Sequence, residues 1–358
     1  MKVTLDAKEL WGAMKIANVV TAKREIPLVV QYVEMSTQSG KCHIRATNLE
    51  QAVTIELAKV TSEHVPGDDG VVLLPPVEIL RFLKGEKGAV TLEDKGGYIS
   101  LSVEDAGVSL VKESGDMPVA ETGDCDIEMG DEFIGGLKQV MTAMASDDSR
   151  PILNAVDIKS DGQGELALAA ADGFRLVVRK LSADVPECSM VVPEKAVFFI
   201  ARYMPRDVKM GFDKEKNRAW FRSGNILLAT QLVQGTFPTY QQLIPSAPPE
   251  WKFTVSGPML EHRLTQFIPG PSGISRLIPE DGILNIQQGS DDDGTFKAKV
   301  VAKHEGEGKI AINQVYFSVA AGMFAEMTCE VTTPSSPMKI YGDVDGLTVV
   351  IMPMLVAW

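Results

Sequence analysis

Histidine, cysteine and clustered acidic residues are the side chains that most often do chemistry, and here none has a catalytic spacing. The four histidines show no metal-ligand spacing (His43, His64, His262 and His304). The four cysteines are far apart and form no Cys-x-x-Cys pair (Cys42, Cys125, Cys188 and Cys329). This pattern argues against a zinc site and a disulfide framework, and suits a reducing compartment. The sequence predicts no metal site, no cofactor and no catalytic residues.

Other short motifs have structural explanations. Cys42 and His43 are adjacent on an expected strand, so their side chains point to opposite faces and cannot chelate together. The acidic runs at 67–70 and 291–294 lack the spacing of an EF-hand loop and are typical of solvated turns. Asp161-Gly162-Gln163-Gly164 joins two expected strands and reads as a hairpin turn. Neither a P-loop nor a Gly-x-Ser-x-Gly elbow is present.

Length and composition indicate a globular protein of two or three domains. The chain has 358 residues, of which 45% are hydrophobic and 23% charged, and its formal net charge is −13. That charge disfavours a nucleic-acid binder that relies on lysine and arginine against phosphate. No apolar run approaches the roughly 18–20 residues of a membrane span, and an acid at residue 6 rules out a signal-peptide core. We expect a cytoplasmic protein with no membrane contact.

The chain repeats one order of elements three times. Each copy begins with an amphipathic helical stripe, at residues 10–17, 137–144 and 260–268, with Asp6 as the expected N-cap of the first. In the first two copies a proline follows, Pro27 and Pro151, 124 residues apart, and then a run of strands that starts at 28–35 and 152–158. In the third copy we expect strands at 283–286 and 296–300.

A second helix with further strands completes each copy. Pro75-Pro76 and Pro193 stand at expected helix starts, with stripes over 79–83 and 197–204. Asn313 is the expected cap of a third helix, whose stripe is Tyr316, Val319, Ala320 and Met323. These patterns predict an α+β fold of three tandem homologous domains, 1–124, 125–249 and 250–358. Each would carry two helices packed on mainly antiparallel sheets. Unrelated α+β domains of similar size remain the alternative, because identity between copies is low.

Three segments of the sequence are informative in their residue identities as well as in their hydrophobic spacing. They are Ser149–Val156 together with Ala171–Leu176, then Gly235-Thr236-Phe237-Pro238-Thr239-Tyr240-Gln241-Gln242-Leu243-Ile244-Pro245, and the C-terminal Val349-Val350-Ile351-Met352-Pro353-Met354. In this order and at these separations they resemble the beta subunit of bacterial DNA polymerase III, the beta sliding clamp family. The resemblance covers essentially the whole chain, and it implies a DNA clamp, a head-to-tail homodimer whose six domains close a ring around double-stranded DNA. Twelve helices packed about 9 Å apart would enclose a pore roughly 24 Å wide, enough for a duplex.

The resemblance also implies a pocket for a short linear motif of DNA polymerase subunits, the clamp loader and other replication and repair proteins. Its residues in this chain would be Leu153, Ala171, Gly173, Phe174, Arg175, Leu176, Pro238, Gln242, Leu243, Val350, Met352, Pro353 and Met354. Methionines suit a groove that serves several partners, and Arg175 could anchor a carboxylate or carbonyl group. The chain departs from the family at Ala171 and Phe174, usually Thr and His, and at positions 239, 241 and 242, which are usually charged. The pocket should therefore be more apolar.

Ring closure and DNA proximity are further implications of the resemblance. We expect the basic residues Lys23, Arg24, Lys195 and Arg202 to lie near the DNA. Dimer contacts are expected at Val108, Leu110 and Ile274, with edge strands of the first and third domains paired across the dimer. Such a ring holds DNA topologically, so its outer surface can be acidic. The function expected is that of a processivity factor without catalysis. A clamp-fold scaffold that does not encircle DNA, and an enzyme whose site is not evident, stay open as alternatives.

Overall fold

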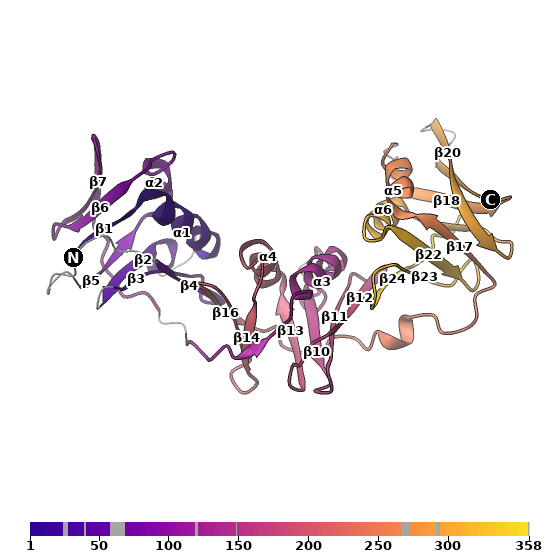
Figure 1. The fold of residues 1–358 in the computed structure, drawn as a ribbon, viewed down its shortest axis with the longest axis horizontal. Coiled ribbons are helices and arrows are strands. Elements are labelled where there is room, and N and C mark those ends of the chain that lie inside the picture. Colours follow the sequence, from indigo (N-terminus) through magenta and orange to yellow (C-terminus); the bar gives the residue numbers. More distant parts are fainter. Residues whose placement is uncertain are drawn as a thin grey trace. The chain divides into compact units, whose positions relative to one another are not determined.

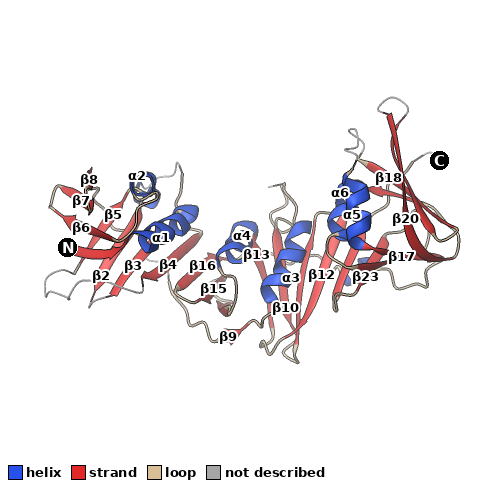
Figure 2. Cartoon of the chain, turned by 45° about the horizontal axis from the view of Figure 1, so that its top comes forward, coloured by secondary structure: helices blue, strands red, loops and turns tan. Residues whose placement is uncertain are grey.

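The computed structural model describes residues 1–23, 28–38, 41–57, 69–118, 121–147, 149–266, 273–290, 294–356 and 358. Every strand pairing in these ranges is antiparallel, and six α-helices lie on the sheets (Figure 2). The described chain divides into two compact units, Met1–Asp131 with Phe198–Leu232, and Glu132–Val197 with Val233–Trp358. The α+β class predicted from the sequence is confirmed.

The first unit contains two sheets. A four-stranded sheet has the order β1-β6-β7-β8, and an eight-stranded sheet the order β5-β2-β3-β4-β16-β15-β14-β9. Figure 1 and Figure 2 between them label these strands, and α1 lies beside α2 and packs on β2, β3 and β4. The bounds are β1 Lys2–Asp6, α1 Ala7–Val20, the 3-10 turn η1 Leu28–Gln31, β2 Val33–Gln38, β3 Lys41–Thr47, β4 Gln51–Leu57, β5 Gly70–Leu74, α2 Pro76–Phe82, β6 Ala89–Asp94, β7 Tyr98–Val103, β8 Ala106–Val111, β9 Ile127–Glu128, β14 Lys209–Asp213, β15 Arg218–Ser223 and β16 Ile226–Gln231.

The second unit is built on one twelve-stranded sheet of order β13-β10-β11-β12-β24-β23-β22-β17-β20-β19-β18-β21. Helix α3 packs on β11 and β12, and α5 packs beside α6. The bounds are α3 Phe133–Val140, η2 Met141–Ala143, β10 Ala155–Ser160, β11 Glu165–Ala171, β12 Arg175–Ser182, β13 Cys188–Pro193, η3 Gln241–Leu243, β17 Trp251–Ser256, α5 Gly257–Thr265, β18 Ile274–Glu280, β19 Ile283–Ser290, β20 Gly294–Glu305, β21 Ile310–Asn313, α6 Gln314–Ala321, β22 Glu326–Val331, β23 Met338–Gly342 and β24 Leu347–Ile351. Helix α4, Glu194–Tyr203, contains the residue at which one unit passes into the other.

Two strand pairings explain why three sequence repeats give two units. Strand β16 pairs with β4, and β24 pairs with β12, so each pairing extends the sheet of one repeat with a strand from the next. The middle repeat therefore contributes β14–β16 to one large sheet and β10–β13 to the other. The boundaries at 124/125 and 249/250 stay a prediction.

The first helix forms as its sequence predicts. Asp6 accepts a hydrogen bond from the backbone N–H of Glu9, an N-cap that satisfies one of the free donors of the first turn. The expected stripe of Leu10, Ala13, Met14 and Ala17 is buried. Pro76 occupies the first turn of α2, where its missing N–H costs no hydrogen bond.

Two details of the sequence prediction are wrong. The run 28–35, expected as strand, begins with the 3-10 turn η1 and enters β2 only at Val33. In α6 the buried residues are Gln314, Phe317, Ala320 and Ala321, not the stripe through Tyr316 and Val319. Since α6 is apolar on most of its circumference, periodicity could not identify the face that packs.

A close backbone approach at Gly211 gives a test of the first unit. A Cβ atom on this β14 glycine would overlap the carbonyl oxygen of Asp124, which is backbone and cannot rotate away. We expect Gly211→Ala to lower the free energy of unfolding by about 1–3 kcal/mol, as overpacking does. Gly12→Ala is the control, because Gly12 lies inside α1 with nothing within 4 Å of the added methyl. That variant should be stabilised by roughly 0.5–1 kcal/mol. Urea unfolding measures both free energies, and equal changes for Gly211→Ala and Gly12→Ala would contradict the close approach of Gly211 to Asp124.

Candidate functional site

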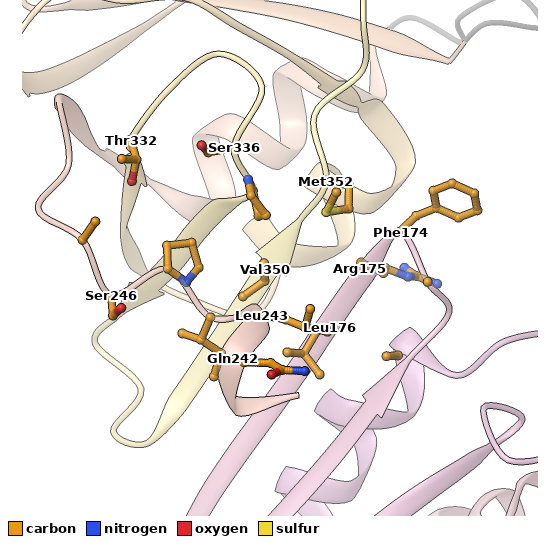
Figure 3. A pocket seen from close by; sticks show the side chains of 16 residues that line it. Phe174, Arg175, Leu176, Gln242, Leu243, Ser246, Thr332, Ser336, Val350 and Met352 are labelled. Atoms are coloured by element: carbon orange, nitrogen blue, oxygen red, sulfur yellow. The ribbon is translucent and has the colours of Figure 1, made fainter. Parts of the chain in front are cut away.

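A cavity lies in the second unit, where the β11–β12 hairpin meets the end of β24 and the segment after η3 (Figure 3). Its volume is about 540 Å³, within the range of ligand pockets. Its lining is mostly apolar and comes from four separate stretches of chain: Ala171, Gly173, Phe174, Arg175, Leu176, Gln242, Leu243, Ile244, Pro245, Ser246, Ala247, Thr332, Ser336, Pro337, Val350 and Met352.

The hairpin that carries one wall is fixed by an aspartate turn. Oδ1 of Asp172 accepts hydrogen bonds from the backbone N–H groups of Phe174 and Arg175, at 2.9 and 3.0 Å. Gly173 has a φ of 94°, a left-handed conformation that glycine adopts without a steric penalty. This turn places Phe174 at the tip, on the rim of the cavity.

Strand pairing builds the floor. Leu176 of β12 stands opposite Val350 of β24, and both are buried. The backbone N–H of Met352 donates to the carbonyl oxygen of Phe174 at 2.8 Å, which extends the pairing past the end of β24. Around this floor stand side chains that are about half exposed, namely Phe174 at 59%, Leu243 at 50% and Met352 at 43%. The result is a buried apolar floor with an exposed apolar rim.

Arg175 has intramolecular partners. Its Nε donates to Oδ2 of Asp172 at 3.0 Å, and its guanidinium lies 4.3 Å from the ring centroid of Tyr316 on α6. Burial, together with the negative charge of Asp172, raises the pKa of Tyr316 above its usual value. Asp172 therefore engages Nε of Arg175, and the expectation that Arg175 anchors a carboxylate or carbonyl group of a ligand stays a prediction.

The structure brings nine of the thirteen predicted pocket residues together in this lining. Leu153 belongs instead to the buried core beneath the pocket, and Pro238 is exposed outside the lining. Pro353 forms a bridge with Ile312, and the N–H of Met354 donates to the carbonyl oxygen of Ala311, so both continue along β21.

Sequence reasoning missed seven lining residues. Ile244 and Pro245 stand inside the 235–245 motif, and Ser246 and Ala247 follow it directly, so the motif itself was a signal for them. Thr332, Ser336 and Pro337 come from the β22–β23 connection, and only the pairing of β23 with β24 brings them to the cavity.

The other predicted residues lie elsewhere. Lys195 and Arg202 are exposed on α4 and Lys23 is exposed after α1, whereas Arg24 lies outside the described residues. Val108 and Leu110 are half-buried on β8, the end strand of the four-stranded sheet. Ile274 begins β18, which is paired with β19 and β21.

Groups that could hold a metal ion are absent from the described part of the chain. All four cysteines are buried and outside any disulfide, and burial raises the pKa of Cys42 to about 12, far from a reactive thiolate. Among the described helices, none has both the length and the apolarity of a membrane span.

Comparison with known proteins finds one family consistently. Residues 129–239 match the family model described as DNA polymerase III beta subunit, central domain. The chain is 29% identical over 196 residues to the beta sliding clamp homolog GriR of Streptomyces muensis, a match that spans about half the length of each protein. It is 24% identical over 389 aligned positions to the beta sliding clamp of Caulobacter vibrioides, covering 99% of this chain and 100% of that one.

Solved structures share the complete fold. The DnaN sliding clamp of Pseudomonas aeruginosa bound to griselimycin superposes with a TM-score of 0.91 at 19% identity, covering 99% of this chain and 100% of that chain. DNA polymerase III beta subunit of Thermotoga maritima superposes with a TM-score of 0.87 at 21% identity, with the same coverage. At such identities the likeness concerns the fold.

A buried carboxylate lies close enough to Tyr240, the residue before η3, to affect its ionisation. Asp157 of β10 is 1% exposed, and Nζ of Lys159 is 3.0 Å from its Oδ2. Burial raises the pKa of Asp157, although Lys159 opposes the shift. Burial and the charge of Asp157 also raise the pKa of Tyr240, which precedes η3, to about 12.

This carboxylate should make stability depend on pH. Because the folded-state pKa is raised, the contribution of Asp157 is most favourable when the group is protonated, and it is lost as the pH rises through that pKa. We expect Asp157→Asn to unfold at a temperature several degrees higher than the wild type at pH 7, with the difference vanishing below about pH 4. Thermal melts between pH 3 and 8 measure this, with the exposed Asp345→Asn as control. A variant that is less stable at pH 7 would contradict the account.

Proposed function

The chain belongs to the DNA polymerase III beta subunit family, the beta sliding clamps, and we propose that it acts in the cytoplasm as a DNA sliding clamp that encircles duplex DNA. In this proposal it tethers the replicative polymerase and other replication and repair proteins through short peptide segments. It catalyses no reaction itself. The observation that carries the proposal is the apolar cavity formed by the β12–β24 pairing, whose walls include the segments that resemble the family motifs.

The chemistry of the cavity favours an extended apolar peptide. Leu176 and Val350 offer a buried floor, while Phe174, Leu243 and Met352 are exposed apolar side chains that a ligand would cover. Methionine is flexible and polarizable, so it can adapt to several partners. A tethered polymerase would then remain at high local concentration near the primer end, which is how a clamp without catalysis raises processivity.

A ring requires more than one chain. The proposal takes three domains per chain, 1–124, 125–249 and 250–358, and six in a homodimer. Open strand edges support such a dimer. Strand β8 ends its sheet, and among the described residues the 294–301 part of β20 pairs only with β19 while β17 pairs beyond it.

The side chains at these two edges are complementary. Val111 of β8 is 83% exposed and Val301 of β20 is 84% exposed, which is unusual for valine on a strand. The β7–β8 turn carries exposed Glu104 and Asp105, while β20 carries the exposed Lys297 and Lys299. Pairing β8 of one protomer with β20 of its partner would cover the valines and bring opposite charges together. Val108 and Leu110 would lie at this seam, and Ile274 two strands away from β20.

Passage of DNA needs only a mildly basic lining. The exposed helical positions include Lys8, Lys15, Arg81, Lys138, Lys195 and Arg202. These lysines and arginines would contact DNA phosphates without recognising the base sequence. A closed ring would keep the protein on DNA, which a net charge of −13 does not favour. Lys23, Arg24, Lys195 and Arg202 are the proposed DNA-proximal residues.

A scaffold that keeps the clamp fold without encircling DNA is the second candidate function. The observation that favours it is the third repeat, where α5 and α6 expose Met259 and Val315 and α6 has no basic residue. Binding a peptide is compatible with both functions, whereas topological retention on DNA separates them.

Replacement of Met352 tests the pocket. A peptide with a Gln-Leu-x-Leu-Phe motif should bind, and Met352→Ala should weaken it about tenfold, because truncating a contact residue of a binding site costs more than about 1 kcal/mol at the important positions. The measurement is fluorescence anisotropy with a labelled peptide. Met259→Ala is the matched control, since this methionine is similarly exposed in the same unit and lies outside the cavity lining. Absence of measurable binding to the wild type, or equal losses in the two variants, would refute the pocket.

Charges at the two strand edges test the dimer. We expect Val111→Asp and Val301→Asp each to weaken association at least tenfold, because each would bury an aspartate within the seam. Sedimentation equilibrium gives the dissociation constants. Val71→Asp is the control, because Val71 is also an exposed valine on an end strand, β5 of the eight-stranded sheet. If Val111→Asp and Val301→Asp leave the dissociation constant as little changed as Val71→Asp does, the dimer interface lies elsewhere.

A further inference from the structure

A second cavity in the first unit repeats the geometry of the one described above. It lies where the β3–β4 hairpin meets the end of β16, and its volume is about 170 Å³. Half of its eight lining residues are polar, and the lining consists of Thr47, Leu49, Glu50, Gln51, Ala52, Pro118, Arg218 and Ala229.

The two hairpins have the same backbone. Oδ1 of Asn48 accepts from the N–H groups of Glu50 and Gln51 at 3.1 and 2.8 Å, as Oδ1 of Asp172 does from Phe174 and Arg175. The N–H of Asn48 donates to the carbonyl oxygen of Gln51, as that of Asp172 does to Arg175. Leu49 has a φ of 76° where Gly173 has 94°. A leucine in this conformation is uncommon and is held there by the turn.

Strand register extends the correspondence to the whole lining. Ala52 stands opposite Ala229 in the β4–β16 pair, as Leu176 stands opposite Val350 in the β12–β24 pair. The residues of the hairpin and Pro118 each lie 124 residues before their counterparts. All eight lining residues thereby match residues of the larger pocket: Thr47 with Ala171, Leu49 with Gly173, Glu50 with Phe174, Gln51 with Arg175, Ala52 with Leu176, Pro118 with Gln242, Arg218 with Pro337 and Ala229 with Val350.

The side chains give the smaller cavity a different chemistry. Nε of Arg175 donates to the carboxylate of Asp172, whereas the equivalent residue of the first hairpin, Asn48, has no carboxylate and its Oδ1 already accepts two backbone hydrogen bonds. Gln51 is 6% exposed, and its Nε2 is a buried donor without a hydrogen-bond partner among the described residues. A buried unpaired donor costs stability, so its presence in a cavity wall calls for an acceptor from outside.

We propose that this cavity is a second binding site, which accepts the carboxylate of an aspartate or glutamate side chain from an extended segment of a partner protein. Nε2 of Gln51 donates to one carboxylate oxygen, and the guanidinium of the half-buried Arg218 supplies the positive charge. The volume admits one short side chain, and Leu49 and Ala229 contact its methylene groups. Glu50 lies exposed at the rim, where water screens its charge.

The inference stands on the geometry of the first unit and holds whether or not a peptide occupies the larger pocket. Its readout is the side-chain amide signal of Gln51 in a TROSY spectrum of the full-length, ¹⁵N-labelled protein, identified by its loss in Gln51→Met. The probes are acetyl-Gly-Asp-Gly-amide, the same peptide with asparagine, and sodium acetate. We expect a saturable shift with the aspartate peptide and an affinity about tenfold lower for the asparagine peptide, because the charge-assisted hydrogen bond is lost.

Variants separate this site from alternatives. Arg218→Gln should weaken the aspartate peptide about tenfold, whereas Met352→Ala in the larger pocket should leave its affinity unchanged. Gln51→Met should melt at or above the wild-type temperature, since it removes an unpaired donor. A shift that does not saturate, an Arg218→Gln variant that binds normally, or a lower melting temperature for Gln51→Met would each overturn the proposal. Acetate binding as tightly as the peptide would overturn the partner segment as the source of the carboxylate.

Discussion

The backbone pairing of β4 with β16 and of β12 with β24 is the constraint on which the rest of the structure depends. Each pair joins a strand of one sequence repeat to a strand of the next, so a sheet runs without interruption across the junction. At both junctions the register fixes a hairpin tip against the end of the neighbouring strand. The two cavities are consequences of this pairing, because a sheet that continues past a hairpin leaves a hollow beside the tip.

Side chains then give the two hollows different properties. In the second unit the tip carries Phe174 over Leu176, and Nε of Arg175 is paired with Asp172 within the chain. In the first unit the equivalent positions are Glu50, Ala52 and Gln51, and the cavity is smaller and more polar, with polar residues making up half of its lining. One backbone arrangement thus offers an apolar site and a polar site within a single chain.

Features that depend on interactions between residues close in sequence could be predicted, whereas features that depend on contacts between distant residues could not. The helix at Ala7–Val20 was predictable because its cap and its buried stripe are local, and Asp6 caps it as expected. Nine pocket residues could be named from short motifs that resemble a known family. Thr332 and Pro337 could not, since only the β23–β24 register brings them to the cavity, and the partners of Arg175 depend on where Tyr316 lies in space. The buried face of α6 was missed because a helix that is apolar nearly all round carries no periodic signal.

The proposed function depends on retention by topology, because a net charge of −13 disfavours retention by phosphate contacts alone. The most direct measurement loads the protein onto a nicked circular plasmid with a clamp loader and ATP, isolates the complex by gel filtration, and then cuts the DNA once. We expect the protein to remain bound to the circular DNA at salt concentrations that abolish electrostatic binding. It should be released when the DNA becomes linear. Protein that fails to load, or that remains bound equally to circle and linear DNA, would contradict a ring around the duplex.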